Sequence, residues 1–437
     1  MADPELPVPD GLVLRPFRGV RFAVADLAAV TSPPYDLIGE TGVRDLLTAH
    51  PNNVVRLILP GADRHRYAEA RQTLHAWLSS SVLVTDEVPG VYVYEQSGPG
   101  TLQRGLIGEV GLASPERGTI LPHEDVMPGP VADRLALMRT TEANLEPIFL
   151  LYEGGGGAAT RLVDQVAAAR TPLVETVTGD GLRHRLWAVT DPAELAAVDA
   201  DLRPRRALIA DGHHRYATYR ALQAEHRATG HEAAGHHTAA SPDSAAGPWD
   251  FGLALLVDSD AYPPDLQAIH RVIPGLPLGE ALARAKGAWQ AHEYADLAEG
   301  LAALREIAGP AFLLAAGGPA HLITDPDPDQ VAHAMPTGRS ARWRALNTSI
   351  LAEFLLPKVW GMRDDEHSVR IVHHDPEAAV RLAHDFGGTA VLMNPLAVDD
   401  VLAVAAQGER VPRKSTSFGP KPRTGLLMRL LTPGRSC

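Results

Sequence analysis

Cysteine is almost absent from this chain, which has one in 437 residues, at position 437. A single cysteine excludes an internal disulfide as a source of stability, and such scarcity is typical of a reducing cytosol, so we expect a cytoplasmic protein. Long apolar runs are missing too, and none approaches the roughly 20 residues of a membrane-spanning helix. The acidic, proline-rich start, MADPELPVPDG, does not resemble a signal peptide.

Positive charge is also in short supply. The chain has 40 Lys and Arg against 53 Asp and Glu, a formal net charge of −13. A surface of that sign repels nucleic acid and anionic lipid, so we expect neither as a partner. Lysine is scarcest, and the four lysines are Lys286, Lys358, Lys414 and Lys421. Two of these four lie in one stretch, RKSTSFGPKPR, which draws attention to it.

What remains is ordinary globular composition, with 45% hydrophobic residues and enough length for two or three domains. Short apolar runs alternate with amphipathic segments, which predicts a mixed α/β or α+β fold. We divide the chain into an α/β block at 1–115, a core at 116–229, a mobile loop of small and polar residues at 230–248, and a second α/β block at 249–437.

Several secondary-structure elements follow from periodicity. The β-branched run NVVRLILP (Asn53–Pro60) predicts a strand. GVYVYEQSG and TLQRGLIGEVGLA predict a hairpin, and LQAIHRVIPGL predicts another strand. The long stretch at 278–308, LGEALARAKGAWQAHEYADLAEGLAALREIA, predicts a helix.

The stretch ADGHHRYATYR combines a turn, a helix start and several basic side chains. Its motif residues are Asp211, Gly212, His213, His214 and Arg215. Cations at a helix N-terminus are disfavoured by roughly 0.3–1 kcal/mol each, so we expect a negative group there. Helix N-termini bind phosphate, and arginine adds bidentate reach. The alternatives are a solvated helix end and a zinc site, although adjacent histidines lack the usual spacing of zinc ligands.

Tyr216 and Tyr219 lie three residues apart on that helix, and two interpretations stay open. They could pack against a sheet or flank a nucleotide base. Separately, ILPHEDVMPGP places His123, Glu124 and Asp125 on a loop bounded by prolines. A carboxylate held by rigid backbone suits a general base or a magnesium ligand. The alternative is a solvated loop with an ion pair to Arg134.

Three further stretches have weaker patterns. EGGGGAATRLV has the G-x-G-x-x-A spacing of a dinucleotide fingerprint, but four consecutive glycines are more typical of a flexible turn. VPRKSTSFGPKPRTGLL lacks the first glycine of a P-loop, yet its basic and hydroxyl residues could hold a phosphate or a carboxylate. The alternative is a basic surface tail. In AIHRVI, His270 and Arg271 lie on opposite faces of a strand, and a buried core histidine is the plainer interpretation.

Several stretches resemble one family in the same order along the chain: PFRGVRF, SPPYDLI, NVVRLILP, ILPHEDV, DRLALMRTTEANLEPIF, ADGHHRYATYRAL, AIHRVI and VPRKSTSFGPKPRTGLL. They resemble the bacterial and archaeal family known as domain of unknown function 1015. The PHE and DGHHR motifs also resemble those of free L-serine kinases with the ParB/sulfiredoxin-like fold. The spacing is wider than in compact members of that fold, at 211 − 124 = 87 residues.

The resemblance implies a ParB/sulfiredoxin-like nucleotide-binding core with further α/β blocks at either end. It implies a small-molecule kinase that phosphorylates free L-serine or a related hydroxylated amino acid. Glu124 would be the base, with His123 and Asp211 as further catalytic residues. Gly212, His213, His214, Arg215 and Tyr216 would bind the nucleotide phosphates. Substrate-binding candidates are Asp36, Arg134, Asn144, His270, Arg271, Lys414, Ser415 and Thr416.

The implied cofactor is Mg²⁺ with ATP, although ADP or another phosphate donor stays open. Asp211 or Glu124 would hold the magnesium ion. The expected partners are a nucleotide and a small-molecule substrate, and a homodimer is compatible with the sequence. Two other functions stay open: a nucleotide-responsive binding module without enzymatic activity, and a phosphohydrolase that uses the same site.

Overall fold

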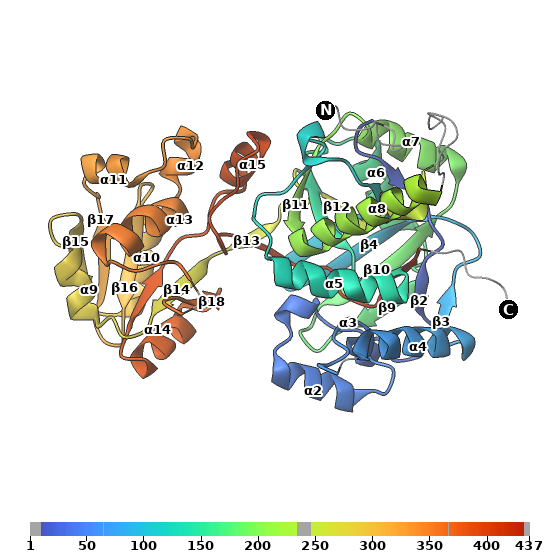
Figure 1. The fold of residues 1–437 in the computed structure, drawn as a ribbon, viewed down its shortest axis with the longest axis horizontal. Helices are drawn as coiled ribbons and strands as arrows, with labels where there is room; N and C mark the ends of the chain where they lie inside the picture. The colour runs from blue at the N-terminus through green and yellow to red at the C-terminus, as the bar shows by residue number, and fades with distance from the viewer. Residues whose placement is uncertain (1–9, 64, 234–245, 366, 432–437) are drawn as a thin grey trace. The chain divides into compact units, whose positions relative to one another are not determined.

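The computed structural model describes residues 10–431, except for residues 64, 234–245 and 366. The chain divides into two compact units. The first unit takes the chain up to residue 121, then residues 126–264 and the chain from residue 420 onwards; the second unit takes residues 122–125 and 265–419. Each unit mixes helices and strands (Figure 1), which confirms the predicted mixed α/β class.

Within its described residues, the first unit is built on a nine-stranded mixed sheet. Its strands, in spatial order, are β6 (Ile120–Leu121), β11 (Ala207–Asp211), β8 (Ile148–Tyr152), β12 (Phe251–Asp258), β5 (Thr101–Gly111), β4 (Val91–Gly98), β10 (Arg183–Val189) and β9 (Val174–Val177), with β1 (Leu14–Arg15) paired to β5. The pairs β6–β11 and β8–β12 are parallel and the others antiparallel. The hairpin β4–β5 confirms the prediction for these strands.

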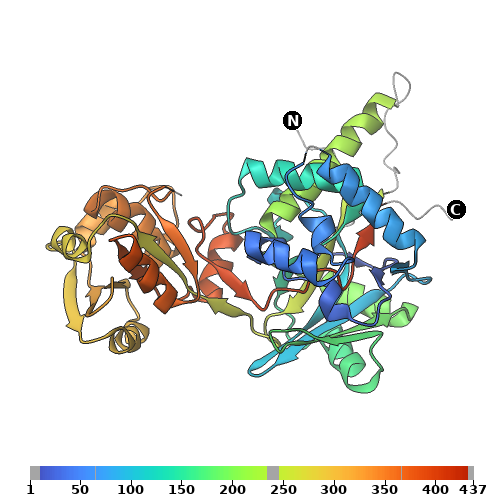
Figure 2. The same cartoon turned by 90° about the horizontal axis from the view of Figure 1, so that it is seen from below.

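Two small ladders and a set of helices complete this unit. The ladders are β2 (Val20–Phe22) with β3 (Leu83–Thr85), and β7 (Ala143–Asn144) with β21 (Arg429–Leu430). The helices are α1 (Leu27–Val30), η1 (Tyr35–Leu37), α2 (Glu40–Ala49), α3 (Val55–Ile58), α4 (Arg66–Ser79), η2 (Pro115–Arg117), α5 (Pro128–Thr141), α6 (Ala158–Ala169), α7 (Pro192–Leu202), α8 (His213–Ala233) and η3 (Pro248–Asp250). Helices α5 and α8 pack side by side (Figure 1), and α8 is the long yellow-green helix of Figure 2.

The second unit has its own sheet and its own core. The sheet order is β15 (Gln290–Tyr294), β17 (Ala320–Thr324), β16 (Ala311–Ala315), β19 (Thr389–Leu392), β14 (Ile269–Ile273) and β18 (Arg370–His373), and β13 (Asp265–Gln267) pairs with β20 (Ser417–Gly419). The helices are α9 (Leu278–Ala285), α10 (Leu297–Glu306), α11 (Pro328–Ala334), α12 (Ala341–Ala345), α13 (Asn347–Ile350), the π-helical η4 (Leu351–Val359), α14 (Pro376–Asp385) and α15 (Val398–Ala406). Side chains from α10 and α14 pack on the buried face of this sheet.

Two predicted elements are wrong. The run at Asn53–Pro60 forms the helical turn α3, because the Asn53 side chain accepts the N–H of Val55 at 3.0 Å and starts the turn. Its residues Val54, Val55, Leu57 and Ile58 are all buried, a pattern that suits a strand and a buried helix equally. The predicted helix at 278–308 is interrupted by strand β15, and Gly287, at φ +88°, turns the chain between α9 and β15.

The four predicted blocks stay predictions. The helix α8 extends to Ala233, and most of the loop predicted at 230–248 lies outside the described residues. No helix in the described ranges has the length and apolar character that crossing a membrane requires.

Candidate functional site

The DGHHR motif forms the junction between β11 and α8 in the first unit. Gly212 has φ +93°, a conformation that side chains rarely adopt, and a Cβ there would lie 3.0 Å from Cγ2 of Ile148. The first helical hydrogen bond runs from Tyr216 N–H to the Gly212 carbonyl at 2.8 Å. The N–H groups of the first turn therefore point out of the helix end rather than into its own ladder, and such groups attract anions.

Two basic side chains converge on Asp211. One carboxylate oxygen lies 2.5 Å from Nη2 of Arg215, and the other lies 2.6 Å from Nζ of Lys421. The same ammonium lies 2.6 Å from Oδ2 of Asp36. Burial alone would lower the pKa of Lys421, but Asp211 and Asp36 outweigh it and raise that pKa. Lys421 is therefore a firmly charged group beside the start of α8.

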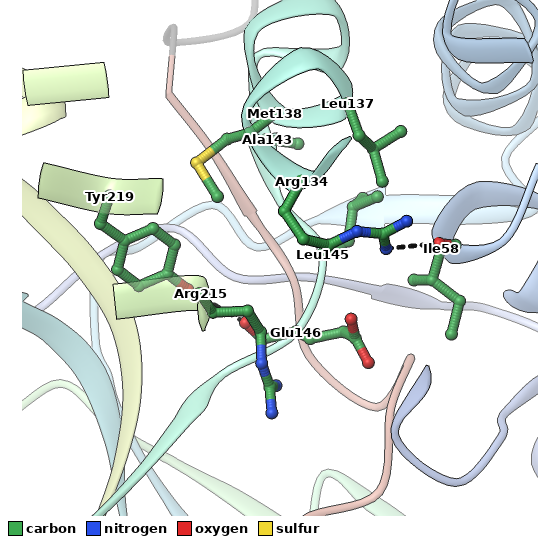
Figure 3. Close-up of a pocket in the computed structure, with 9 residues that line it drawn as sticks. All are labelled: Ile58, Arg134, Leu137, Met138, Ala143, Leu145, Glu146, Arg215 and Tyr219. Atoms are coloured by element: carbon green, nitrogen blue, oxygen red, sulfur yellow. Dashed lines mark hydrogen bonds between the residues drawn. The ribbon is translucent and has the colours of Figure 1, made fainter. Parts of the chain in front are cut away.

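A small cavity lies behind this cluster. Figure 3 shows the charged ends of Glu146 and Arg215 below the apolar side chains of Leu137 and Met138, and the cavity has a volume of about 30 Å³. Glu146 accepts the N–H of Tyr35 at 3.2 Å and the hydroxyl of Thr424 at 3.0 Å.

The Arg215 side chain is held firmly against this cavity. It is 5% exposed and donates to the Pro147 carbonyl at 2.5 Å, while its Nε has no hydrogen-bond partner in the described part of the chain. Burial would lower its pKa, but Glu146 and Asp211 raise it, so the guanidinium keeps its charge. Arg134 lines the same cavity and donates to the Ile58 carbonyl at 2.6 Å (Figure 3).

The implied magnesium ion does not fit the carboxylates predicted to hold it. Each oxygen of Asp211 faces a cation rather than open space. Glu124 accepts hydrogen bonds from its neighbours and lies beside Lys414. Among the described residues, no group of three acidic or histidine side chains could ligate a metal. A magnesium ion here would depend on oxygens that come with the nucleotide, as is common for this metal.

The PHE loop belongs to the second unit, where the KST stretch surrounds Glu124. Thr416 donates its hydroxyl to Oε1 of Glu124 at 2.9 Å, and the backbone N–H groups of Ser415 and Thr416 also bond this carboxylate. Nε2 of His123 lies 2.7 Å from the same Thr416 hydroxyl. Because Thr416 has one hydrogen and gives it to Glu124, the hydrogen-bond network assigns the donor role to His123 Nε2.

Glu124 has the electrostatics of an acid–base group. Burial raises its pKa above the ordinary range, and this outweighs the lowering effect of the Thr416 bonds and the charge of Lys414. A carboxylate with a raised pKa is more basic than a free one, so it is a better acceptor for a hydroxyl proton. His123 is buried and packs edge-on against Phe418, so its ring is fixed.

His270 and Arg271 lie behind this cluster, on β14. Arg271 is 1% exposed and donates to the carbonyls of Arg413 at 3.0 Å and Lys414 at 2.9 Å. Burial lowers its pKa to about 10. Nδ1 of His270 accepts the N–H of Met393 at 3.4 Å, and burial lowers the pKa of His270 to about 4. Arg271 therefore holds the KST turn, and His270 is the buried core histidine of the plainer interpretation.

Two other predicted site residues, Tyr216 and Asn144, lie in the packed interior. Tyr216 is 4% exposed and donates its hydroxyl to the Ala113 carbonyl at 2.7 Å, so it packs against the sheet and has no free ring face for a base. Asn144, a predicted substrate contact, is 1% exposed and accepts from Leu253 N–H and from Arg429. The contacts of Tyr216 and Asn144 are those of structural residues. His214 is only half-buried, and its Nε2 accepts the N–H of Met127 at 3.1 Å.

The glycine-rich loop before α6 is occupied by carboxylates of the chain itself. Gly154 N–H donates to Asp258 at 2.9 Å and Gly155 N–H to Asp260 at 2.9 Å. A Cβ on Gly154 would lie 2.0 Å from Oδ2 of Asp258, so glycine is required there for packing. This disfavours the dinucleotide interpretation of that loop.

The structure adds residues to the site that were not among the predicted contacts. Lys421 reaches Asp211 and Asp36, and Tyr35 and Glu146 surround Arg215. The scarcity of lysine drew attention to the stretch that contains Lys414 and Lys421. It did not indicate which of the two lysines lies beside which motif. Tyr35 and Glu146 lie in SPPYDLI and DRLALMRTTEANLEPIF, two stretches that resemble the family, but nothing in either stretch singled out these residues.

The chain is similar to solved structures that include a free serine kinase in complex with AMP, at 14% identity and a TM-score of 0.32, covering 72% of this chain and 87% of that one. Another is SbnI with a C-terminal truncation from Staphylococcus aureus, at 11% identity and a TM-score of 0.36, covering 74% and 87%. A conserved hypothetical protein from Pyrococcus furiosus matches at 12% identity and a TM-score of 0.31, covering 72% and 90%.

The sequence itself gives a firmer relation. No curated protein matches the chain. One family does match it, over residues 14–349 and so over more than half of its length. That match includes the PHE loop and the DGHHR turn, and it ends before the KST stretch. The chain therefore belongs to the family described as Protein of unknown function (DUF1015).

Proposed function

We propose that this protein is a nucleotide-dependent phosphotransferase that acts on the hydroxyl group of a small molecule, with free L-serine as the first candidate. The observation that carries the proposal is the start of α8, where Lys421 and Arg215 converge on Asp211 beside the N-terminal turn of the helix. Phosphoryl transfer depends on positioning and on neutralising phosphate charge more than on covalent chemistry. A rigid turn with two cations supplies both.

In this proposal, the nucleotide phosphates bind the first turn of α8. The turn is rigid because Gly212 is enclosed by Ile148 and Arg215. Lys421 pairs with Asp36 and Asp211 when no ligand is present, and an incoming phosphate competes for the same ammonium. Arg215 stays on Asp211 and Pro147 and keeps the turn in place. Magnesium comes with the nucleotide and neutralises phosphate charge when it is bound.

Glu124 is the base of the proposed reaction. It accepts the proton of the acceptor hydroxyl as the phosphoryl group is transferred, and its raised pKa favours that role. Thr416 orients the carboxylate, and His123 orients Thr416. Such a hydrogen-bonded chain fixes the base in one direction without neutralising it. The choice of serine rests on the resemblance of the PHE and DGHHR motifs to those of free L-serine kinases.

The direct test is an incubation of the purified protein with Mg·ATP and L-serine, followed by quantification of ADP, free phosphate and O-phosphoserine. Formation of ADP and O-phosphoserine in equal amounts supports the proposal. ADP with free phosphate would indicate a phosphohydrolase instead, and nucleotide binding without turnover would indicate a binding module. The assay is repeated with ADP and pyrophosphate as donors and with threonine and homoserine as acceptors, so that a different substrate is not mistaken for inactivity.

A further inference from the structure

The turn that bonds Glu124 is itself built like an anion-binding site. Lys414 has φ +54°, a left-handed conformation, and the hydroxyl of Ser415 donates to the Pro412 carbonyl at 2.6 Å. After this sharp bend, the successive N–H groups of Ser415 and Thr416 point at one carboxylate, together with the Thr416 hydroxyl. Successive backbone N–H groups in such a bend form a concave site for an anion.

The charges around this turn favour an anion as well. Arg271 is buried beneath the turn, and its partners are backbone carbonyls. Among the ion pairs of the described residues, none joins Arg271 to a carboxylate, and its Nε has no hydrogen-bond partner there. Lys414 adds a second positive charge beside Glu124. Asp364 acts on Arg271 from a distance but is paired with Arg413, so the buried guanidinium of Arg271 has no carboxylate of the described residues in direct contact. An anion in the turn offsets part of the cost of burying it.

Glu124 is more exposed than the carboxylate that fills the glycine-rich loop of the first unit. The glycine-rich loop of the first unit shows the contrast, because Asp258 there is fully enclosed in the core and bonds Gly154 and Thr160. Glu124 instead is only partly buried and lies on a loop next to an exposed Asp125. Burial raises its pKa, so its ionised form is held at a cost in free energy.

We propose that the turn of Lys414, Ser415 and Thr416 is a binding site for the oxyanion of a small ligand, a carboxylate or a phosphate group, and that Glu124 occupies it until the ligand displaces it. The bound ligand then accepts the hydrogen bonds that Ser415 and Thr416 give to Glu124 in its absence. The inference goes beyond the proposed function, since it concerns a site within the second unit and requires no turnover.

The test measures anion binding to the full-length protein without nucleotide. Inorganic phosphate and acetate are titrated separately, by calorimetry or by NMR, into the wild type, Glu124→Gln and Asp125→Asn. Asp125→Asn is the matched control, because it removes a neighbouring negative charge that does not bond the turn. We expect Glu124→Gln to bind at least one of the two anions about tenfold or more tightly than both other proteins do, since that substitution removes the competing charge. The anion that binds more tightly, acetate or phosphate, shows whether the site prefers a carboxylate or a phosphate group.

A second pair of variants locates the ion. In the Glu124→Gln background, Lys414→Met should abolish the gain in affinity, whereas Lys421→Met, which removes the charge beside α8 in the first unit, should leave it. Equal affinities for Glu124→Gln and Asp125→Asn would overturn the inference, and so would a gain that survives Lys414→Met. Glu124→Ala should show the same gain in affinity. This control excludes the possibility that the glutamine amide itself binds the anion. Neither result depends on whether the protein transfers phosphate.

Discussion

Gly212 is the residue of the DGHHR turn where backbone conformation and close packing both require glycine. Gly212→Ala is expected to lower the free energy of unfolding by about 1–3 kcal/mol, through a positive φ and the 3.0 Å approach to Ile148. Gly61→Ala is a matched control, because Gly61 has φ +92° and a Cβ placed on it would meet no atom within 4 Å. It should cost about 1 kcal/mol or less. Urea denaturation of both variants measures the difference, and equal losses would show that crowding at Gly212 is unimportant.

We expect nucleotide affinity to depend strongly on the charge of Lys421. Lys421→Met leaves Asp36 and Asp211 without their shared cation and removes a charge that phosphate needs. The dissociation constant for Mg·ATP should rise about tenfold or more, in line with roughly 1.5–3 kcal/mol for a hydrogen bond to a charged group. Lys286→Met, at an exposed lysine, should leave it unchanged. Normal nucleotide binding by Lys421→Met would exclude this cluster as the phosphate site.

The strand β21 shows how a short terminal element can stabilise the first unit. Arg429 lies 2.6 Å from Glu109, donates to Asn144 and to two carbonyls, and has a side chain 2% exposed. Arg15 pairs with the same Glu109 at 2.8 Å, but its side chain is 41% exposed. Arg429→Leu should therefore cost about 3–5 kcal/mol, and Arg15→Leu about 1 kcal/mol or less. Denaturation curves of the two variants compare them, and similar losses would contradict this account.

Local sequence rules predicted those helices and strands whose hydrophobic period is clear and whose ends are marked by turn residues. The helix α8 follows from the Asp-Gly turn that precedes it, and the hairpin β4–β5 from an apolar run that is interrupted once. The same rules did not predict β15, whose residues are mostly exposed and carry little apolar alternation, so the helix-like residues on both sides hid it. The buried α3 was missed because a continuous apolar run has no period.

The site was predictable where a short motif determines the local backbone conformation. It was not predictable where residues far apart in the sequence come into contact. The turn at Gly212 follows from two adjacent residues. The pairing of Lys421 with Asp211 joins segments 210 residues apart (421 − 211 = 210), and no local pattern encodes it. Local motifs alone therefore favoured Lys414, which lies instead beside Glu124. Tyr216 shows the reverse case, because its helical position suited both a base contact and the packing that is observed.

Both units carry a buried histidine that should make the protein sensitive to acid. Burial lowers the pKa of His184 on β10 and of His270 on β14 to about 4, from an ordinary value of 6.5. Between these values the folded state binds fewer protons than the unfolded state. The stabilisation is therefore complete above pH 6.5 and is lost as the pH falls towards 4, by up to about 3 kcal/mol per histidine.

Denaturation at pH 7.5 and at pH 4.5 measures this loss. His184→Gln and His270→Gln should each reduce the difference between the two pH values, whereas His292→Gln, at an exposed histidine, should leave it as in the wild type. A wild-type protein whose free energy of unfolding is the same at both pH values would contradict the assignment of these histidines as buried neutral groups.

The central claim is that Glu124 is the base of a phosphoryl transfer, and one variant tests it most directly. Steady-state turnover with Mg·ATP and L-serine is measured for Glu124→Gln beside Asp125→Asn, with calorimetric nucleotide affinity for both. We predict that kcat of Glu124→Gln falls by about 10²–10⁴ while its nucleotide affinity changes by no more than about twofold, and that Asp125→Asn keeps both values. Full turnover by Glu124→Gln would contradict the account, because the proton would then leave the hydroxyl by another route.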